Sequence, residues 1–351
     1  MSWTHPLDLH EIRLRIASSL DLKDLASCAR VSQDWNDSFT LPLYNSVVWS
    51  KHGPSMESVE RNKHLIQHLT IQSSAYDTLS SRSARDKVVS NIVANWTLST
   101  LNLSGNSIGD NGAQALGEAL KTNSALMTLN LGANSIGENG AQALADALKT
   151  NSALSTLTVS GNPIGDNGAQ ALGEALKTNS TLATLDLAYN SIGENGAQAL
   201  AEALKTNSTL TTLDLHWLRH SDELSSEHFD FSSNSIGDNG ARALAEALKT
   251  NSALSTLTLL SNSIGDHGAR ALGEALKTNS TLSTLNLLGN SIGDNGARAL
   301  AEALKTNSTL RTLTLFDNPI GDNGARALAE ALKTSSTLTS LNFLVNKIGP
   351  N

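Results

Sequence analysis

The sequence predicts an α/β fold: a right-handed solenoid, shaped as a horseshoe, with parallel strands on the concave side and helices on the convex side. Three observations lead to this prediction. A unit of 28 residues recurs along most of the chain, each unit begins with a short alternation of apolar and polar residues, and each continues with apolar residues at helical spacing. One strand and one helix cannot bury their apolar faces alone, so the units must stack on one another.

A leucine opens each unit and marks where the repeats lie. Residues 98–351 hold eight full units and a partial ninth, with this leucine at Leu98, Leu126, Leu154, Leu182, Leu210, Leu254, Leu282, Leu310 and Leu338. Upstream, Ile66, Leu69 and Ile71 copy the spacing of the first unit. We therefore expect residues 51–97 to contain a linker and a degenerate repeat that caps the N-terminal end of the array.

The first half of a unit is expected to form a strand and a tight loop. Leu101 and Leu103 alternate with Thr100 and Asn102, as in a strand with one buried face. Asn106 follows and recurs in every unit. Buried loop backbone groups cost about 1–3 kcal/mol each when they are unpaired. We therefore expect these asparagines to form a buried ladder that bonds the loop backbone of its own turn and of the next.

The second half of a unit is expected to form a helix of about ten residues. Asp110 is placed to cap the N-terminus of this helix. Leu116 and Leu120 lie on its buried face, whereas Glu118 and Lys121 lie outside at a spacing that allows a weak ion pair. Parallel strands stack about 4.8 Å apart and helices about 10 Å apart, so the array must bend with its helices outside.

The motif LxxLxLxxNxIGxxGAxxLxxxL is present in nearly every unit from Leu98 onward. It resembles the leucine-rich repeats of the ribonuclease-inhibitor type, the long repeats with a full helix. The resemblance implies a horseshoe that binds proteins along its concave strands or their rims. It does not imply which protein is bound, and it implies no cofactor.

One outward strand position changes character along the array. It is small or polar in the N-terminal units and becomes Leu260, Leu288, Phe316 and Leu344 in the C-terminal ones. On neighbouring strands these four side chains would form an apolar stripe of roughly 15 Å. Contiguous exposed apolar surface commonly marks an interaction site, so we predict that this stripe binds the protein partner. The alternative is that the curvature of the concave face, or the ninth unit, already covers it.

One helix position also divides the array in two. Four glutamines in the N-terminal units give way to arginines in the C-terminal ones; the glutamines are Gln114, Gln142, Gln170 and Gln198, and the arginines Arg242, Arg270, Arg298 and Arg326. Each arginine has a glutamate four residues later. Phosphate binding is one interpretation, but a solvated face on which each arginine pairs with its own glutamate is the favoured one.

Residues 216–231 interrupt the repeat pattern. Removing them joins Leu215 to Ser232 and restores a regular unit, but residues 229–231 could also replace 213–215 as the strand. Both registers stay open. The insertion contains His216, His220, Asp222, Glu223 and His228, but these lack the closely spaced ligand pairs of zinc sites, and we predict no metal site. A flexible loop or retained unspliced coding sequence accounts for the segment.

Residues 1–50 have a different pattern, which predicts three short helices. The apolar residues follow a spacing of three to four, and the residues that carry a resemblance are Pro6, Ile12, Ile16, Leu20, Leu25, Val31 and Trp35. This segment resembles an F-box, the adaptor-binding motif of ubiquitin-ligase substrate receptors. The resemblance implies a small all-α domain whose named residues bind the adaptor subunit of an SCF ligase. The alternative is a helical cap that shields the open end of the solenoid.

Composition and charge argue against several other classes of protein. A formal net charge of −8 argues against a broad nucleic-acid-binding surface. No apolar run approaches the roughly 18–20 residues needed to span a bilayer, no secretory signal is visible, and the single Cys28 fits a reducing compartment. No catalytic or nucleotide-binding motif is present. We therefore predict neither an enzyme nor a cofactor, and a location in the cytoplasm or nucleus.

Three functions are compatible with this pattern. The first is a substrate receptor of an SCF-type ubiquitin ligase, in which the F-box-like segment binds the adaptor and the concave face binds a protein substrate. The second is a GTPase-activating protein of the Ran type, which uses similar long repeats. The third is a stand-alone binding scaffold or inhibitor, in which the N-terminal helices are only a cap.

Overall fold

The computed structural model describes residues 45–51, 56–78, 82–216 and 234–349. In this part of the chain, eleven strands form one parallel sheet whose order follows the sequence. The strands are β1 (Ser46–Trp49), β2 (His68–Ile71), β3 (Thr100–Asn102), β4 (Thr128–Asn130), β5 (Thr156–Thr158), β6 (Thr184–Asp186), β7 (Thr212–Asp214), β8 (Thr256–Thr258), β9 (Thr284–Asn286), β10 (Thr312–Thr314) and β11 (Ser340–Asn342).

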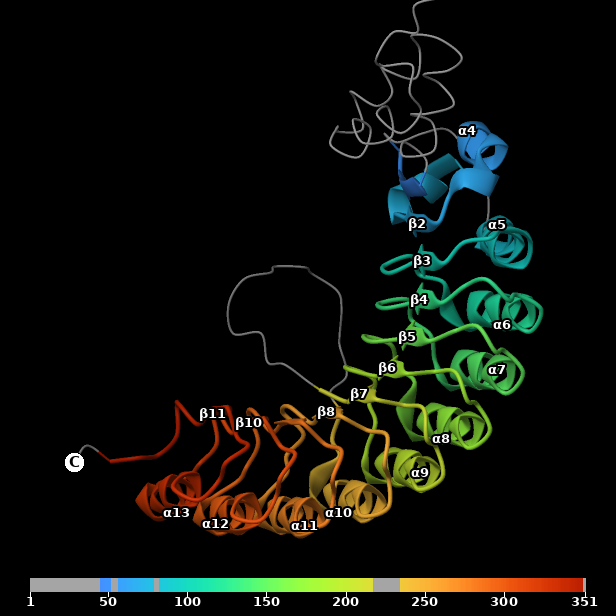
Figure 1. Cartoon of the computed structure of the whole chain (residues 1–351). Helices are drawn as coiled ribbons and strands as arrows, with labels where there is room; N and C mark the ends of the chain where they lie inside the picture. The colour runs from blue at the N-terminus through green and yellow to red at the C-terminus, as the bar shows by residue number, and fades with distance from the viewer. Residues whose placement is uncertain (1–44, 52–55, 79–81, 217–233, 350–351) are drawn as a thin grey trace, which may run out of the picture.

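Helices alternate with the strands and lie on the outer side of an arc, while the sheet lines its inner side (Figure 1). The helices are α4 (Met56–Arg61), α5 (Arg82–Asn95), α6 (Gly109–Leu120), α7 (Glu138–Leu148), α8 (Gly165–Leu176), α9 (Glu194–Leu204), α10 (Gly237–Leu248), α11 (Asp266–Leu276), α12 (Asp294–Leu304) and α13 (Asp322–Leu332). The short 3-10 helices η2 (Lys63–Leu65) and η3 (Ser73–Thr78) precede α5. The predicted α/β solenoid, with concave strands and convex helices, is confirmed.

Equivalent positions of neighbouring units pair with one another across the sheet. Thr100 pairs with Thr128 and Leu101 with Leu129, and this register continues to β11. The inward leucines Leu101 and Leu103 are fully buried, as the alternation predicts. Because the register never slips, each position of the repeat forms a straight row along the sheet, and a row on the concave side presents one side chain from every unit.

The predicted asparagine ladder is present, but it reaches in the opposite direction. The Asn134 side chain is fully buried, and its Oδ1 accepts hydrogen bonds from the backbone N–H groups of Asn106 (2.9 Å) and Ile108 (3.2 Å) in the preceding turn. Its Nδ2 donates to the carbonyls of Leu103 (2.9 Å) and Gly132 (3.0 Å). Each amide therefore bonds its own loop and the preceding one, whereas we expected its own loop and the next.

A second ladder of asparagines, which the sequence analysis missed, joins the other ends of the helices. The Asn151 Nδ2 donates to the carbonyls of Leu120 (2.8 Å) and Asn123 (2.9 Å), and its Oδ1 accepts from Leu154 N–H (2.8 Å). Leu120 is the last residue of α6, so this bond satisfies one of the carbonyls that every helix C-terminus leaves unpaired. The ladder consists of Asn123, Asn151, Asn179, Asn207, Asn251, Asn279 and Asn307.

Asp110 does not cap its own helix, as we had expected, but the next one. Its Oδ1 accepts from the backbone N–H groups of Gly137 (2.7 Å) and Gly140 (3.0 Å) at the start of α7. The first turn of a helix leaves four N–H groups without intrahelical partners, and the neighbouring unit supplies the acceptor. The same bond recurs from Asp166, Asp238, Asp266 and Asp294 to the following helix.

Two units carry glutamate in place of this aspartate, and their junctions differ. Glu138 and Glu194 bond the Nδ2 groups of Asn167 (2.7 Å) and Asn239 (2.9 Å) instead of the backbone of the next helix. At Gly165 and Gly237, which start those next helices, φ is +66° and +61°, whereas Gly137 has a φ of −93°. The array therefore contains two kinds of junction, one capped by an aspartate and one without this cap.

The structure selects one of the two registers at the insertion. Thr212–Asp214 form β7, Leu213 and Leu215 are fully buried, and Asn234 takes the next place in the ladder by donating to Leu215 O (3.0 Å). His216 follows in a regular position: its carbonyl accepts from Tyr189 N–H (3.0 Å), as the Ser160 carbonyl does from Ala133 in an earlier unit. The expected boundary of the insertion, 216–231, therefore includes one residue that belongs to the repeat.

The N-terminal boundary also differs from the expected one. Ser46–Trp49, assigned above to a helical segment of residues 1–50, form β1 and pair with β2, with Val47 and Trp49 buried in the core. Residues 68–71 form the expected degenerate strand. Two irregular units thus precede the first regular one. Pro6, Ile12, Ile16, Leu20, Leu25, Val31 and Trp35 lie outside the residues that the structure describes.

Replacing one ladder asparagine should strongly destabilise the fold. In Asn162→Ala, the buried N–H groups of Asn134 and Ile136 lose their shared acceptor, and the Leu131 carbonyl loses a donor. At about 1–3 kcal/mol for each unpaired group, we expect the free energy of unfolding to fall by about 3 kcal/mol or more in urea denaturation. The control is Asn346→Ala, where the loop is half-buried and water can replace the amide; an equal loss in both variants would contradict this account.

Candidate functional site

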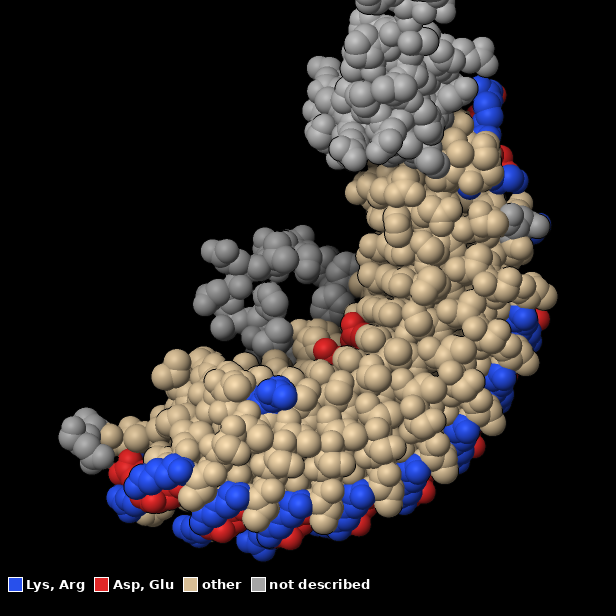
Figure 2. Space-filling view, in the orientation of Figure 1, with Lys and Arg blue, Asp and Glu red and all other residues tan. Residues whose placement is uncertain are grey.

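The concave face is built from rows of outward side chains on β3–β11. The first row is threonine from Thr100 to Thr312 and therefore carries no information that distinguishes one unit from another. The second row holds asparagine, aspartate or threonine, and the third row is the most variable. In Figure 2 the charged side chains gather on the outer, helical side, whereas most of the concave side is free of charge. Charge on this face is therefore an exception that needs a reason.

The second row has a structural task that needs no charge. Asn130 Oδ1 accepts from Gly132 N–H (2.9 Å), and Asn286 Oδ1 from Leu288 N–H (3.1 Å). Asp186 accepts from Ala188 N–H (3.0 Å) in the same way. Since the amide performs this bond as well as the carboxylate does, the fold does not require a negative charge at this position.

Two aspartates nevertheless stand side by side in this row. Asp186 and Asp214 are paired residues of β6 and β7. Burial raises the pKa of the Asp186 carboxyl above its ordinary value; the hydrogen bond from Ala188 N–H opposes this rise, and the negative charge of Asp214 adds to it. When folding raises the pKa of a carboxyl, the folded protein loses stability as the pH rises through that pKa. Folding therefore disfavours the charged form of Asp186, which is more typical of a functional site than of a structural one.

His216 joins this pair from the third row. Its Nδ1 lies 2.7 Å from Asp214 Oδ1, and its ring meets the Tyr189 ring edge-to-face at 5.1 Å between centroids. Burial opposes the protonation of His216, but the hydrogen bond to Asp214 and the charges of Asp214 and Asp186 outweigh it, so the pKa of His216 is raised. We call Asp186, Asp214, His216 and Tyr189 the concave cluster. This site was not predicted from the sequence, although His216 stands six residues after Leu210, which is the spacing of the third row.

The predicted apolar stripe is only partly exposed. Leu260 is buried, with 7% of its surface exposed, so the prediction that it forms part of an exposed stripe is wrong. Leu288 and Phe316 are half-buried, and Leu344 is 70% exposed. The cause is the strand spacing of about 4.8 Å, because side chains of the row cover one another and Leu344 has a described neighbour on one side only. We call Leu288, Phe316 and Leu344 the apolar row.

A further row, which precedes the threonines, was not considered in the sequence analysis. It contains Met127, whose side chain is 53% exposed, and the exposed Arg311, among small residues in the other units. Both lie along the rim of the concave face, next to β4 and β10. The variable second residue of the LxxL motif would have identified them. These two side chains add chemical variety to a rim that is otherwise uniform.

On the convex side the expected arginine–glutamate pairs are replaced by lysine–glutamate pairs. Glu246 Oε1 lies 2.6 Å from Lys249 Nζ, three residues further on, and the same pair recurs in α11, α12 and α13. None of the ion pairs in the described part of the chain includes Arg242, Arg270, Arg298 or Arg326. The interpretation of an internally paired arginine face was therefore wrong, although the lysine–glutamate pair predicted at Glu118 and Lys121 is present at 2.6 Å.

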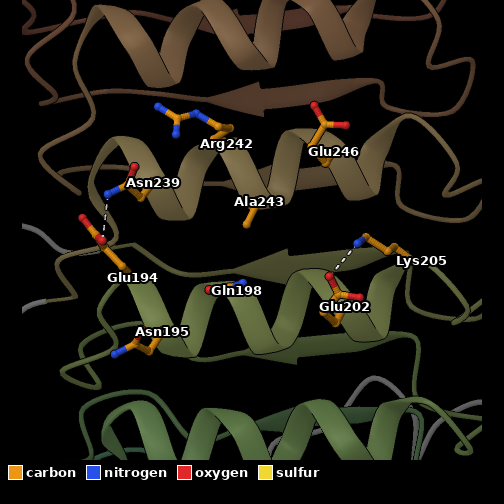
Figure 3. A pocket seen from close by; sticks show the side chains of 9 residues that line it. All are labelled: Glu194, Asn195, Gln198, Glu202, Lys205, Asn239, Arg242, Ala243 and Glu246. Carbon is orange, nitrogen blue, oxygen red and sulfur yellow. Dashed lines mark hydrogen bonds and ion pairs between the residues drawn. The ribbon is translucent and has the colours of Figure 1, made fainter.

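A groove of about 310 Å³ lies between α9 and α10 (Figure 3). Glu202 in this groove pairs with Lys205, and Glu194 accepts from Asn239. Gln198 of α9 and Arg242 of α10 both line the groove, so the change from glutamine to arginine occurs here. The lining is polar, and its carboxylates already have partners within the chain.

Two features that hold neighbouring helices close are both missing at this groove. Glu194 replaces the capping aspartate, and Ala201 stands where three of the eight units have glycine, namely Gly117, Gly173 and Gly273. At Gly173 in α8, an added Cβ would lie 2.9 Å from the carbonyl oxygen of Ala199 in α9, so only glycine allows that close approach. The α9–α10 junction, like the α7–α8 junction, has neither the capping aspartate nor the glycine.

No metal centre is formed in the residues that the structure describes, where no group of three or more His, Cys, Asp or Glu side chains could hold an ion. Of the histidines and acids in the insertion, His216 alone lies in the described residues. His220, Asp222, Glu223 and His228 lie outside them. Within the same described ranges, no helix has the length and apolar character needed to cross a membrane.

Comparison with known proteins identifies the repeat. Seven segments match the Leucine Rich repeat model: residues 94–117, 122–145, 150–173, 178–201, 227–245, 278–301 and 306–329. The fold is therefore a leucine-rich-repeat solenoid, and it provides a scaffold for protein–protein interaction. The fifth segment includes residues 229–231, whereas the structure uses 212–214 as the strand of that unit.

No curated protein matches the chain. Solved structures do, among them "Leiomodin-1 Actin-Binding Site 2 (ABS2)", with 25% sequence identity and a TM-score of 0.32. That similarity covers 41% of this chain and 76% of the other.

The electrostatics of the concave cluster can be tested through His216. In Asp214→Asn the hydrogen-bonded carboxylate is lost while burial remains, so the pKa of His216 should fall, measured by NMR titration of its ring protons. Asp186→Asn should lower it less, because Asp186 acts through its charge alone. In the wild-type chain the pair contributes full stability below the ordinary histidine pKa of 6.5 and loses it as the pH rises through the raised pKa. An unchanged pKa in Asp214→Asn would refute the assignment.

Proposed function

We propose that this leucine-rich-repeat solenoid is the substrate receptor of an SCF-type ubiquitin ligase. Its N-terminal segment binds the adaptor subunit of the ligase, and its concave face holds a protein substrate. The proposal places the chain where such ligases act, in the cytoplasm or nucleus. It assigns no chemistry to the chain itself, because a receptor only positions one protein close to another.

The adaptor half of the proposal is supported by the F-box resemblance of residues 1–50. Pro6, Leu25 and Trp35 stand at the spacing of that motif, and a solenoid follows it. The two irregular units of β1 and β2 already cover the N-terminal end of the regular array. A separate helical cap is therefore not needed for stability, which favours another task for the preceding residues.

The substrate half is supported by the concave cluster, and this is the observation that carries the proposal. Folding disfavours the charged form of Asp186, a cost that an asparagine at the same position would avoid. The apolar row begins two strands further along the same face, about 10 Å from β7. Charge and apolar surface at this separation suit a protein partner that presents a cationic group beside apolar side chains.

Adaptor binding should depend on residues 1–43 and not on the solenoid. We expect the full chain to co-purify with the SCF adaptor subunit, and both Leu25→Ala/Trp35→Ala and a chain that starts at Tyr44 to lose it. The deletion stops at residue 43 because β1 begins at Ser46, and removal of this strand would strip the core of Val47 and Trp49. Far-UV circular dichroism and thermal unfolding should be unchanged by the double substitution.

Retention of the adaptor by the double variant or the shortened chain would refute the receptor proposal. Failure of the full chain to bind the adaptor would do the same and leave a stand-alone binding scaffold. Acceleration of Ran GTP hydrolysis by the full chain would favour the GTPase-activating function instead.

Substrate binding should depend on the apolar row. In cells treated with a proteasome inhibitor, proteins that co-purify with the wild-type chain and are ubiquitinated should be lost from Phe316→Ser/Leu344→Ser. Leu344 is exposed and Phe316 half-buried, so we expect at most about 2 kcal/mol of lost stability. The control is Ser104→Ala/Ser160→Ala, which changes the same row in the N-terminal units. A large fall in melting temperature, or equal loss of partners in both variants, would show that the row is not a specific binding surface.

A further inference from the structure

We propose that the convex side of α10–α13 binds an extended acidic peptide segment through a row of four arginines. The arginine row consists of Arg242, Arg270, Arg298 and Arg326, one from each helix. It lies on the opposite side of the array from the concave cluster. The proposal is therefore independent of the substrate and adaptor sites, and either can fail without the other.

The arginine row distinguishes two halves of an array that is otherwise nearly uniform. The capping aspartate, the buried leucines and the lysine–glutamate pairs recur in both halves. At the position of the arginines, every unit before the insertion has glutamine. Glutamine is as exposed and as compatible with a helix as arginine, so the fold itself is indifferent to the change. What the change adds is four positive charges on one side.

These charges have no carboxylate partner within the described part of the chain. All four arginines are exposed. Among the described residues, the only hydrogen bond of the row runs from Arg298 Nη1 to Asn295 Oδ1 (3.2 Å), and no carboxylate pairs with any of the four arginines. The glutamates one turn away, beginning with Glu246, are occupied by lysines three residues further on. A carboxylate from outside the chain would therefore meet free guanidinium groups, each of which offers a planar fork of donors.

The spacing of the row indicates the kind of ligand. Neighbouring packed helices lie about 8–10 Å apart, so four of them place the row over roughly 30 Å. A peptide in the extended polyproline II conformation rises about 3.1 Å per residue with three residues per turn. Carboxylates at every third residue then lie on one side of the peptide, about 9 Å apart, and match this interval. The helices follow a curved outer surface (Figure 1). An extended chain can bend along this surface, whereas a straight helix would lose contact with the arginines at the two ends of the row.

The chemistry beside the row favours a peptide over nucleic acid. Double-stranded DNA carries a negative charge about every 1.7 Å along its axis, and such a ligand would also face the glutamates that stand one turn from each arginine. A peptide with neutral residues between its carboxylates avoids these contacts.

The row has a defined end at the α9–α10 groove. Arg242 lines one wall of the groove, and Gln198 and Glu202 line the other (Figure 3). Lys205, the cation on that wall, is already paired with Glu202. An acidic segment that continued past α10 would find no free cation there. The site therefore accommodates a segment with about four carboxylates and no longer acidic run.

The test uses the full chain and a fluorescent peptide of about twelve residues with glutamate at every third position and serine or glycine between. We expect saturable binding in fluorescence anisotropy at low salt, weakening as salt is added. Replacing all four arginines by the glutamine of the other half, as Arg242→Gln/Arg270→Gln/Arg298→Gln/Arg326→Gln, should weaken binding at least about tenfold. The melting temperature should be unchanged, because all four side chains are exposed.

The matched control removes the same charge from the N-terminal half, as Lys121→Gln/Lys149→Gln/Lys177→Gln/Lys205→Gln, and should leave binding nearly unchanged. A second peptide of the same composition, with its glutamates in one block, should bind more weakly. Equal weakening by both quadruple variants would overturn the proposal in favour of non-specific attraction. Equal binding of both peptides would overturn the spacing argument, and tighter binding of single-stranded DNA than of the spaced peptide would overturn the assignment of a peptide.

Discussion

The asparagine ladders are the interaction on which the rest of this structure depends. The loops between strand and helix bury several of their backbone N–H and C=O groups inside the array. Asn134 supplies both a donor and an acceptor to such a loop, and Asn151 does the same at the helix C-termini. Because each amide bonds the preceding unit as well as its own, no unit is complete alone. The chain is stable only as an array.

These hydrogen bonds between neighbouring units fix the strand register and thereby limit which positions are free to vary for binding. Since every unit must present the same groups to its neighbours, the concave face consists of uniform rows, and specificity is confined to a few departures. Asp186 is the clearest, because Asn130 and Asn286 make the same backbone bond without a charge. The concave cluster is therefore an addition to the fold and not a part of its architecture.

Local patterns predicted the strands, the buried leucines and the first ladder, because these follow from alternation and helical spacing within one unit. What they missed was decided between units. Asp110 caps the next helix, which lies 27 residues further along the chain, and no local rule indicates this. Leu260 is buried by its neighbours in the row although it points outward. At Glu246, two partners at allowed spacings competed, and the choice of Lys249 over Arg242 could not be read from spacing alone.

The features that set the two halves apart meet at one junction. Between α9 and α10 the capping aspartate is replaced by Glu194, and the close approach that glycine allows in α8 is absent at Ala201. His216 follows β7, the strand that precedes α10. Across the same groove, the glutamines of the N-terminal units give way to arginines. Tight junctions tolerate little change, because an added atom meets backbone, as at Gly173. A junction without these contacts tolerates more. At this junction the array changes in charge, in length and in concave chemistry, and its packing lacks both of the close contacts that join α8 to α9.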